Sequence, residues 1–199
     1  MADQSTQQTL KEKLGGRNIF LIGMMGSGKS QTGPELAKKI NYAFVDIDDV
    51  IEKAAKQSIA EIFEKDGESV FRELEKQVLK EISQHHSLVI ATGGGLVTLP
   101  ENWGILHQGI VIWLDLDLKR SIRRIEGDDK KRPLLDDSDD MSQTFSRVYE
   151  SRKLIYSESD LRIKVEDESP SEVAAMITEH LPSILIDPET QAGPHTTEL

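Results

Sequence analysis

The eight residues from Gly23 to Ser30, GMMGSGKS, are the sequence feature that most constrains how this chain folds. They follow a short apolar run, Ile19 to Ile22, and lead into a segment with helical patterning, Pro34 to Ile40. A glycine-rich turn that ends in Lys-Ser, between a strand and a helix, is typical of the P-loop that binds the phosphates of a mononucleotide. The alternative is a chance glycine turn before a helix, but the complete pattern in this context favours the P-loop.

Each residue type in this loop has a physical role in phosphate binding. The glycines permit backbone conformations that other residues avoid, so that successive amide hydrogens point toward phosphate oxygens. Lys29 supplies positive charge for the outer phosphates, the Ser30 hydroxyl is placed to ligate Mg²⁺, and the start of the following helix attracts the same anion. We therefore predict that the nucleotide is bound by Gly26, Ser27, Gly28, Lys29, Ser30 and Gln31.

Length and charge predict one domain with small-molecule partners. A chain of 199 residues is long enough for one well-buried core, and no linker rich in Pro, Gly or Ser divides its middle. We expect a single domain over residues 17–185, with flexible tails over residues 1–16 and 186–199. The net charge of -11 argues against nucleic acid or an anionic membrane surface as a partner, and we expect a monomer.

The absence of cysteine and of long apolar runs indicates where the chain works. Without cysteine there is no disulfide and no thiolate metal site, which fits a reducing compartment. No apolar run approaches the roughly 20 residues that span a bilayer. The first 16 residues lack the apolar core of a secretion signal. We therefore expect a cytoplasmic protein.

Short apolar runs alternate with helical patterns along the chain and predict the fold class. The runs read as buried strands over Ile19–Ile22, Ala43–Val45, Leu88–Ala91, Ile110–Leu114 and Leu161–Val165. Strands separated by helices predict parallel βαβ units, so we expect an α/β fold in which helices cover both faces of a five-stranded parallel sheet. Ser169 to Glu172 predicts a capping box that starts a further helix.

The segment from Glu126 to Asp140, EGDDKKRPLLDDSDD, fits poorly with a compact core because it is dense in charge. It predicts an exposed, mobile excursion. In a phosphotransferase such a segment is a candidate lid that excludes water from the transferring phosphate. A solvated loop without a function is the alternative.

Five further motifs follow the P-loop and together resemble one family. They are Phe44 to Asp48 (FVDID), Phe71 to Glu75 (FRELE), Gly93 to Gly95, Arg132 to Leu135 (RPLL) and Ser151 to Tyr156 (SRKLIY). Singly most are weak, but in this order and spacing they closely resemble the shikimate kinase family over about residues 17–181. The resemblance implies a three-layer, P-loop nucleotide-kinase-like fold with a mobile lid. It implies an enzyme that uses ATP and one Mg²⁺ per subunit to phosphorylate the 3-hydroxyl of shikimate, a step of chorismate biosynthesis.

Two aspartates follow the second predicted strand. Carboxylates at strand carboxyl ends in an open α/β sheet face the ligand crevice, and side chains at 46 and 48 point the same way if the strand continues that far. The resemblance implies that Asp46 joins Ser30 in the Mg²⁺ site. It implies that Asp48 binds the acceptor hydroxyls of shikimate, as the base or as a positioning group. The residue pattern alone leaves open that Asp48 only caps the helix before Val50.

Two arginines are assigned to the substrate carboxylate by the resemblance. A planar guanidinium suits a carboxylate, although by pattern alone Arg72 and Arg152 resemble solvated surface charges. Glu75 lies three residues after Arg72 on a predicted helix, where it is placed to hold the guanidinium. The resemblance also places Phe63 and Phe71 against the substrate ring, although their pattern alone is that of core residues.

Three consecutive glycines, Gly93, Gly94 and Gly95, put bare backbone at the end of another strand, where a ligand can approach closely. The resemblance implies that they contact the oxygens of shikimate.

The resemblance also completes the catalytic and nucleotide sites. It implies that the lid residue Arg132 closes on the transferring phosphate and acts in catalysis together with Lys29 and Asp48. It places Arg124 and Pro170 at the wall on the adenine side.

Three alternatives remain open at the level of sequence. Thr92 stands where many P-loop enzymes keep a Mg²⁺ carboxylate, and Asp115 after the fourth strand is a rival to Asp46 for that role. A kinase of another small metabolite, such as gluconate, shares the P-loop. A catalytically silent nucleotide-binding homologue is also possible, but such a protein is expected to have lost Lys29, Asp48 or Arg132.

Overall fold

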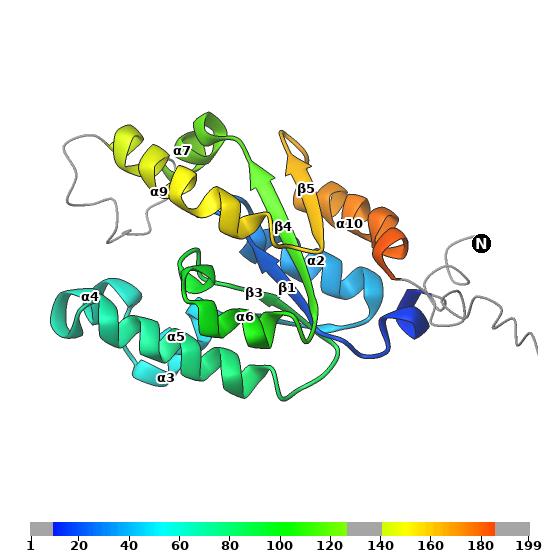
Figure 1. The fold of residues 1–199 in the computed structure, drawn as a ribbon, viewed down its shortest axis with the longest axis horizontal. Helices are drawn as coiled ribbons and strands as arrows, with labels where there is room; N and C mark the ends of the chain where they lie inside the picture. The colour runs from blue at the N-terminus through cyan, green and yellow to red at the C-terminus, as the bar shows by residue number, and fades with distance from the viewer. Residues whose placement is uncertain (1–9, 127–140, 186–199) are drawn as a thin grey trace, which may run out of the picture.

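A fully parallel sheet of five strands forms the centre of the computed structural model, which describes residues 10–126 and 141–185 (Figure 1). The strand order is β2-β3-β1-β4-β5. The strands are β1 (Ile19–Ile22), β2 (Ala43–Asp46), β3 (Leu88–Ala91), β4 (Ile110–Leu116) and β5 (Leu161–Val165). The five-stranded parallel sheet is therefore confirmed.

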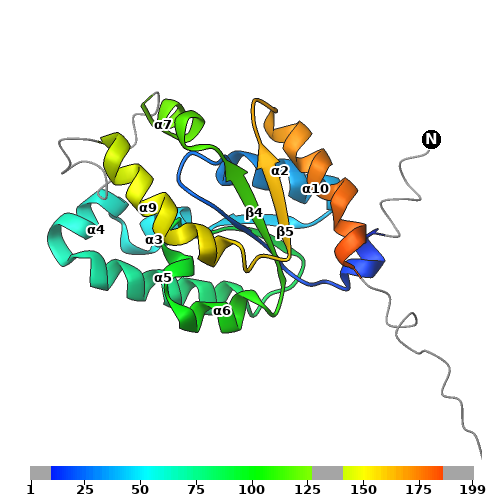
Figure 2. The same ribbon diagram turned by 45° about the horizontal axis from the view of Figure 1, so that its top comes forward.

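Helices cover both faces of the sheet, which confirms the three-layer prediction (Figures 1 and 2). One face carries α3 (Ile47–Ala55), α4 (Ile59–Asp66), α5 (Glu68–Ile82), α6 (Pro100–Leu106), α7 (Leu118–Glu126) and α9 (Met141–Tyr156), with the short 3-10 helix η1 (Leu96–Thr98). The other face carries α2 (Lys29–Ile40) and α10 (Pro170–Ile184), which pack against each other.

The central strands divide their side chains between two hydrophobic clusters. Phe20 of β1 pairs in register with Ile90 of β3 and Val111 of β4, and all three belong to the cluster under α5 and α9. The neighbouring residue Ile19 faces the opposite cluster, under α2 and α10. Because successive strand side chains point to opposite faces, the continuous apolar runs of β1, β3 and β4 fill both clusters.

The prediction that all five strands are buried is wrong for β2 and β5. Both lie at edges of the sheet, and no residue of β2 is fully buried. In β5, Arg162 and Lys164 are exposed whereas Ile163 and Val165 are buried. An edge strand has only one neighbouring strand, and the alternation of polar and apolar residues in β5 is the pattern of a half-buried strand.

Two predicted boundaries also differ from the structure. Residues 10–14 are helical and Leu14 is fully buried in the cluster under α10, so the folded part extends N-terminal to the predicted boundary at residue 17. Helix α2 begins at Lys29 and includes Pro34, five residues before the helix predicted from Pro34 onward. The predicted capping box at Ser169 and Glu172 is confirmed at the start of α10.

The predicted lid falls outside the described residues except for Glu126, and so does Arg132. Among the helices of the described part, none is both long and apolar enough to cross a membrane.

Candidate active site

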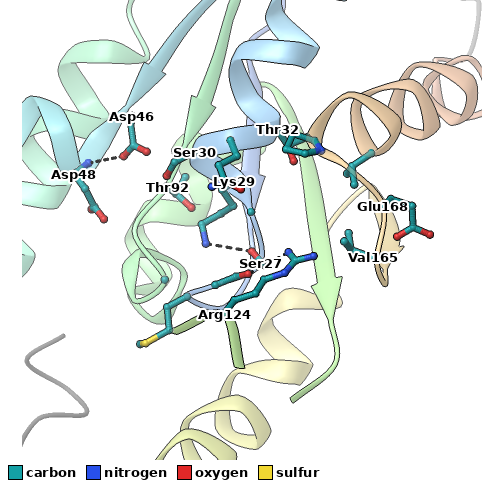
Figure 3. Close-up of a pocket in the computed structure, with 17 residues that line it drawn as sticks. Ser27, Lys29, Ser30, Thr32, Asp46, Asp48, Thr92, Arg124, Val165 and Glu168 are labelled. Atoms are coloured by element: carbon teal, nitrogen blue, oxygen red, sulfur yellow. Dashed lines mark hydrogen bonds between the residues drawn. The ribbon is translucent and has the colours of Figure 1, made fainter. Parts of the chain in front are cut away.

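Strand carboxyl ends surround a cavity of about 740 Å³ (Figure 3). The P-loop and the start of α2, residues 25–32, form its floor. Chain segments that follow β2 and β3 contribute Asp46, Asp48, Thr92 and Gly94. Open α/β sheets bind ligands in the crevice outside the carboxyl ends of their strands. The crevice lies at the topological switch point, beside the strand whose neighbours on its two sides are connected in opposite directions. Here that strand is β1, which lies between β3 and β4.

The P-loop backbone takes the conformations that its glycines permit. Gly23, Gly26 and Gly28 have φ angles of 142°, 79° and 92°, all in the range that side-chain-bearing residues avoid. A Cβ on Gly23 would also lie 2.6 Å from the carbonyl oxygen of Leu114. Glycine is therefore required at position 23 both by its backbone angle and by the close approach of β4.

The Lys29 ammonium lies inside the loop that it terminates. Its Nζ donates to the carbonyl oxygens of Gly23 at 2.8 Å and Met24 at 2.9 Å, and to Ser27 Oγ at 3.4 Å. Because α2 starts at Lys29, the amide groups of its first turn and the positive end of the helix dipole face the cavity, where Ser30 also lies. The local structure thus concentrates positive potential where the sequence predicts phosphates.

Asp46 and Asp48 both line the cavity, but not through a continued strand. Strand β2 ends at Asp46 and α3 begins at Ile47. The strand therefore does not continue to residue 48, as it would have to for the two side chains to point the same way along it. Asp46 is the N-cap of α3, and its Oδ1 accepts a hydrogen bond from the Asp48 amide at 3.0 Å. The helix cap is therefore Asp46 rather than Asp48, and a sharp turn brings the two carboxylates to the cavity side by side (Figure 3).

The oxygen groups around the cavity fit Mg²⁺. Ser30, Asp46, Asp48 and Thr92 supply only oxygen donors. In residues 10–126 and 141–185 no group of three or more His, Cys, Asp or Glu side chains could hold a metal ion by itself. Proteins commonly bind Mg²⁺ through one or two carboxylates together with substrate phosphates and water.

The rival carboxylate, Asp115, is engaged elsewhere and does not line this cavity. Its Oδ2 accepts from Arg162 Nε at 2.9 Å, and its Oδ1 accepts from the Tyr149 hydroxyl at 3.2 Å. The Arg162 guanidinium also lies 4.5 Å from the centre of the Trp113 ring. Asp115 therefore joins β4, β5 and α9, and of the two rival carboxylates only Asp46 lines the cavity.

The triple glycine is the point where the predicted substrate residues come together. A Cβ on Gly95 would lie 2.4 Å from both terminal nitrogens of Arg72, and one on Gly93 would lie 2.2 Å from Glu75 Oε1 and 3.1 Å from Asp48 Oδ1. Arg72 pairs with Glu75, as predicted, and with Glu68 at 2.9 Å. Gly93 and Gly95 thus give room for charged side chains that reach the loop from α3 and α5.

Arg152 approaches the same loop from α9. It is buried, and its Nη1 donates to the carbonyl oxygen of Gly94 at 2.8 Å. Tyr156, one helical turn later, donates its hydroxyl to the same oxygen at 3.0 Å. Tyr156 was not among the predicted site residues, although its position four residues after Arg152 on one helix was a usable signal.

Phe63 and Phe71 pack against each other, with ring centres 4.8 Å apart. Phe71 is buried in the cluster under α5, and the Arg72 guanidinium carbon lies 5.3 Å from the centre of its ring. Neither ring lines the cavity. Phe71 is thus a core residue that supports Arg72, whereas Phe63 is partly buried and packs on Phe71. Contact of either ring with the substrate stays a prediction.

The opposite end of the cavity is formed by Arg124, Pro170 and three residues that sequence reasoning missed: Val165, Glu168 and Val173. Arg124 donates to the carbonyl oxygens of Gly26 at 3.4 Å and Glu166 at 3.2 Å, and so connects the P-loop with the segment after β5 (Figure 3). Val165 and Glu168 lie at and after the carboxyl end of β5, where strand ends line the crevice, and Val173 lies in the first turn of α10.

Glu75 is a fully buried carboxyl group at this site. Loss of hydration raises its pKa to about 7. Arg72 opposes this rise, the Asp48 carboxylate adds to it, and Arg152 opposes it to a smaller degree. The Glu75 carboxyl group therefore gains or loses its proton near neutral pH in the folded protein.

A pH-dependent stability difference is expected for Glu75→Gln. Between the ordinary pKa of 4.5 and about 7, the folded state holds more of this proton than the unfolded state, so the contribution of Glu75 to stability falls as pH rises through that range. The free energy of unfolding of the parent, relative to Glu75→Gln, should fall by on the order of 3 kcal/mol between pH 4.5 and pH 8. Urea denaturation of both proteins measures this. Glu73→Gln, an exposed change on the same helix, is the control, and a difference that is constant or rises with pH contradicts the assignment.

Comparisons with known proteins agree with this geometry. The family model described as shikimate kinase matches residues 25–182. The chain is 79% identical over 199 residues to the shikimate kinase of Prochlorococcus marinus strain NATL2A, with 100% of each chain covered. The structure of shikimate kinase from Acinetobacter baumannii in complex with shikimate matches with a TM-score of 0.82 and 34% identity, covering 87% of this chain and 97% of that one. Shikimate kinase from Aquifex aeolicus matches with a TM-score of 0.71 and 33% identity, covering 88% and 99% of the two chains. With the P-loop and the two aspartates lining one cavity, this chain belongs to the shikimate kinase family.

Proposed function

We propose that this protein transfers the γ-phosphoryl group of ATP to the 3-hydroxyl of shikimate, giving shikimate 3-phosphate and ADP. The observation that carries the proposal is the cavity that joins the P-loop to Asp48 and Gly94. Partly buried Arg72 and buried Arg152 lie at the same glycine loop, which puts cations for a carboxylate next to a site for a triphosphate.

The residues divide the work of phosphoryl transfer, which depends on positioning and charge neutralisation more than on covalent chemistry. The P-loop amides and Lys29 bind the phosphates, while Asp48 holds the attacking hydroxyl and is placed to accept its proton. Arg72 and Arg152 orient the substrate through its carboxylate. Arg132, which lies outside the described residues, is proposed from the family resemblance to neutralise charge on the transferring group.

The same proposal extends to Mg²⁺ and to the adenine side. Ser30 and Asp46 would hold Mg²⁺, whose chemical contribution is to offset charge on the phosphates. Arg124 and Pro170 would flank the adenine. From the net charge of -11 we further propose that the protein acts without nucleic acid or membrane partners. A cytoplasmic monomer remains the expectation.

The decisive experiment measures ADP release by the purified protein with ATP, Mg²⁺ and shikimate. Gluconate serves as the competing acceptor, because another small-metabolite kinase shares the P-loop. ADP release with shikimate but not with gluconate supports the proposal. Binding of ATP without turnover on either acceptor would instead identify a silent homologue.

Substituting each of the two candidate metal ligands in turn should show which one binds Mg²⁺. Asp46→Asn is expected to raise the Mg²⁺ concentration for half-maximal activity about tenfold or more, since it removes a charged ligand. Asp115→Asn should leave that concentration within about twofold, because Asp115 is bound to Arg162 and Tyr149 away from the cavity. Mg²⁺ titrations at saturating shikimate give both values. A larger effect in Asp115→Asn than in Asp46→Asn overturns the assignment.

A further inference from the structure

Tyr156 carries a buried polar group that the proposed mechanism does not use. Its side chain is fully buried on the last turn of α9, and its ring stacks on Trp113 with ring centres 5.7 Å apart. Phenylalanine would fill such an apolar site without the cost of burying a hydroxyl. The hydroxyl therefore needs a reason in its polar contacts.

Those contacts are made with the substrate loop. The Tyr156 hydroxyl donates to the Gly94 carbonyl oxygen at 3.0 Å, and Arg152 Nη1 donates to the same oxygen at 2.8 Å. Burial raises the pKa of Tyr156, and the positive charge of Arg152 partly opposes that rise. Arg152 and Tyr156 thus share one acceptor, the Gly94 carbonyl oxygen.

The same hydroxyl reaches the nucleotide loop. It lies 3.6 Å from Met24 Sδ, inside the P-loop whose Met24 carbonyl accepts from Lys29. The Gly94 backbone is also close to the P-loop, since a Cβ on Gly94 would lie 3.7 Å from the Met25 amide nitrogen. Tyr156 therefore stands where α9, the triple glycine and the P-loop meet.

We propose that Tyr156 is a positioning residue for shikimate: its hydroxyl fixes the Gly94 carbonyl and, through it, the guanidinium of Arg152 that faces the substrate carboxylate. The inference rests on the proposed function. Arg152 has five N–H donors and a long side chain that can take many orientations. A carbonyl oxygen that is held in place by a second hydrogen bond, from Tyr156, limits those orientations. The cost of orienting Arg152 is then met in the free protein rather than on substrate binding.

Tyr156→Phe tests this proposal because it removes one oxygen and keeps the ring on Trp113. We expect the KM for shikimate to rise about threefold to tenfold, the range for one lost hydrogen bond, while the KM for ATP stays within about twofold. Tyr149→Phe is the matched control. It removes a hydroxyl from the same helix, but that hydroxyl binds Asp115 rather than the Gly94 loop, so the KM for shikimate should not change.

A double-mutant cycle with Arg152→Lys distinguishes positioning from general loosening of the core. If Tyr156 acts through Arg152, adding Tyr156→Phe to Arg152→Lys should raise the KM for shikimate by much less than it does alone. Tyr156→Met also removes the hydroxyl with different packing, and it should reproduce the selective rise in KM if Tyr156→Phe fails to fold.

Three results overturn the proposal: an unchanged KM for shikimate in the Tyr156 variants, equal rises in the KM values for shikimate and ATP, or full additivity with Arg152→Lys. The parent protein is measured in the same assay. An inactive parent contradicts the proposed function, whereas an active parent with an unaffected Tyr156→Phe contradicts only the role of Tyr156.

Discussion

Lys29→Met is expected to lower kcat on the order of 10³-fold, with a smaller effect on the KM for shikimate. The substitution keeps a long, flexible side chain but removes a cation that no other side chain of the P-loop supplies. Charge neutralisation at the phosphates dominates catalysis of phosphoryl transfer, and the loss of one such cation is correspondingly large. The carbonyl oxygens of Gly23 and Met24 also lose a donor, so the melting temperature should fall by a few degrees.

The control for this prediction lies on the same helix. Lys38→Met removes an exposed cation near the end of α2 and should leave kcat unchanged. Kinetics by ADP release and thermal melts of the three proteins give the comparison. A kcat within threefold of the parent in Lys29→Met means that this lysine has no catalytic role.

Gly95→Ala is expected to raise the KM for shikimate by roughly ten- to a hundredfold through displacement of Arg72. The φ of Gly95 is -97°, which alanine adopts without strain, so the backbone adds no penalty. The new methyl group, however, would lie 2.4 to 2.5 Å from three atoms of the Arg72 guanidinium, which Glu75 and Glu68 hold in place. The guanidinium must move away, and displacing a charged contact to a ligand costs a few kcal/mol.

Gly104→Ala provides the matched glycine substitution, because nothing lies within 4 Å of its added methyl group. It should be neutral or slightly stabilising, as expected for alanine in a helix. In Gly95→Ala the KM for ATP should stay near the parent value. Combining Arg72→Ala with Gly95→Ala should raise the KM for shikimate little beyond the value of Arg72→Ala alone. Additive effects of Gly95→Ala and Arg72→Ala would show that the glycine acts independently of the arginine.

Local sequence signals predicted much of the fold. Continuous apolar runs identified the buried strands β1, β3 and β4 because parallel strands in the middle of a sheet face apolar layers on both sides. The capping box at Ser169 and the Arg72–Glu75 pair were confirmed because both depend on residues within one helical turn. The burial of β2 was predicted wrongly, since an edge position depends on the order of strands and not on the strand itself.

In the candidate site, too, local features could be predicted from the sequence and long-range contacts could not. The P-loop could be predicted, because three glycines with positive φ and a following Lys-Ser form a phosphate cradle from consecutive residues. The engagement of Asp115 with Arg162 and Tyr149 could not, since those partners come from β5 and α9. The triple glycine was predicted to expose bare backbone that contacts shikimate, which stays a prediction. That Gly93 and Gly95 also make room for Glu75 and Arg72 could not be predicted.

The sequence by itself determined the P-loop and the central strands β1, β3 and β4, because those features depend on neighbours along the chain. Only the tertiary structure decided how the substrate groups assemble. Arg152 and Tyr156 meet the Gly94 carbonyl across 58 and 62 positions of sequence. Such contacts depend on how α9 packs over the ends of β3 and β4, and packing is a property of the whole buried core.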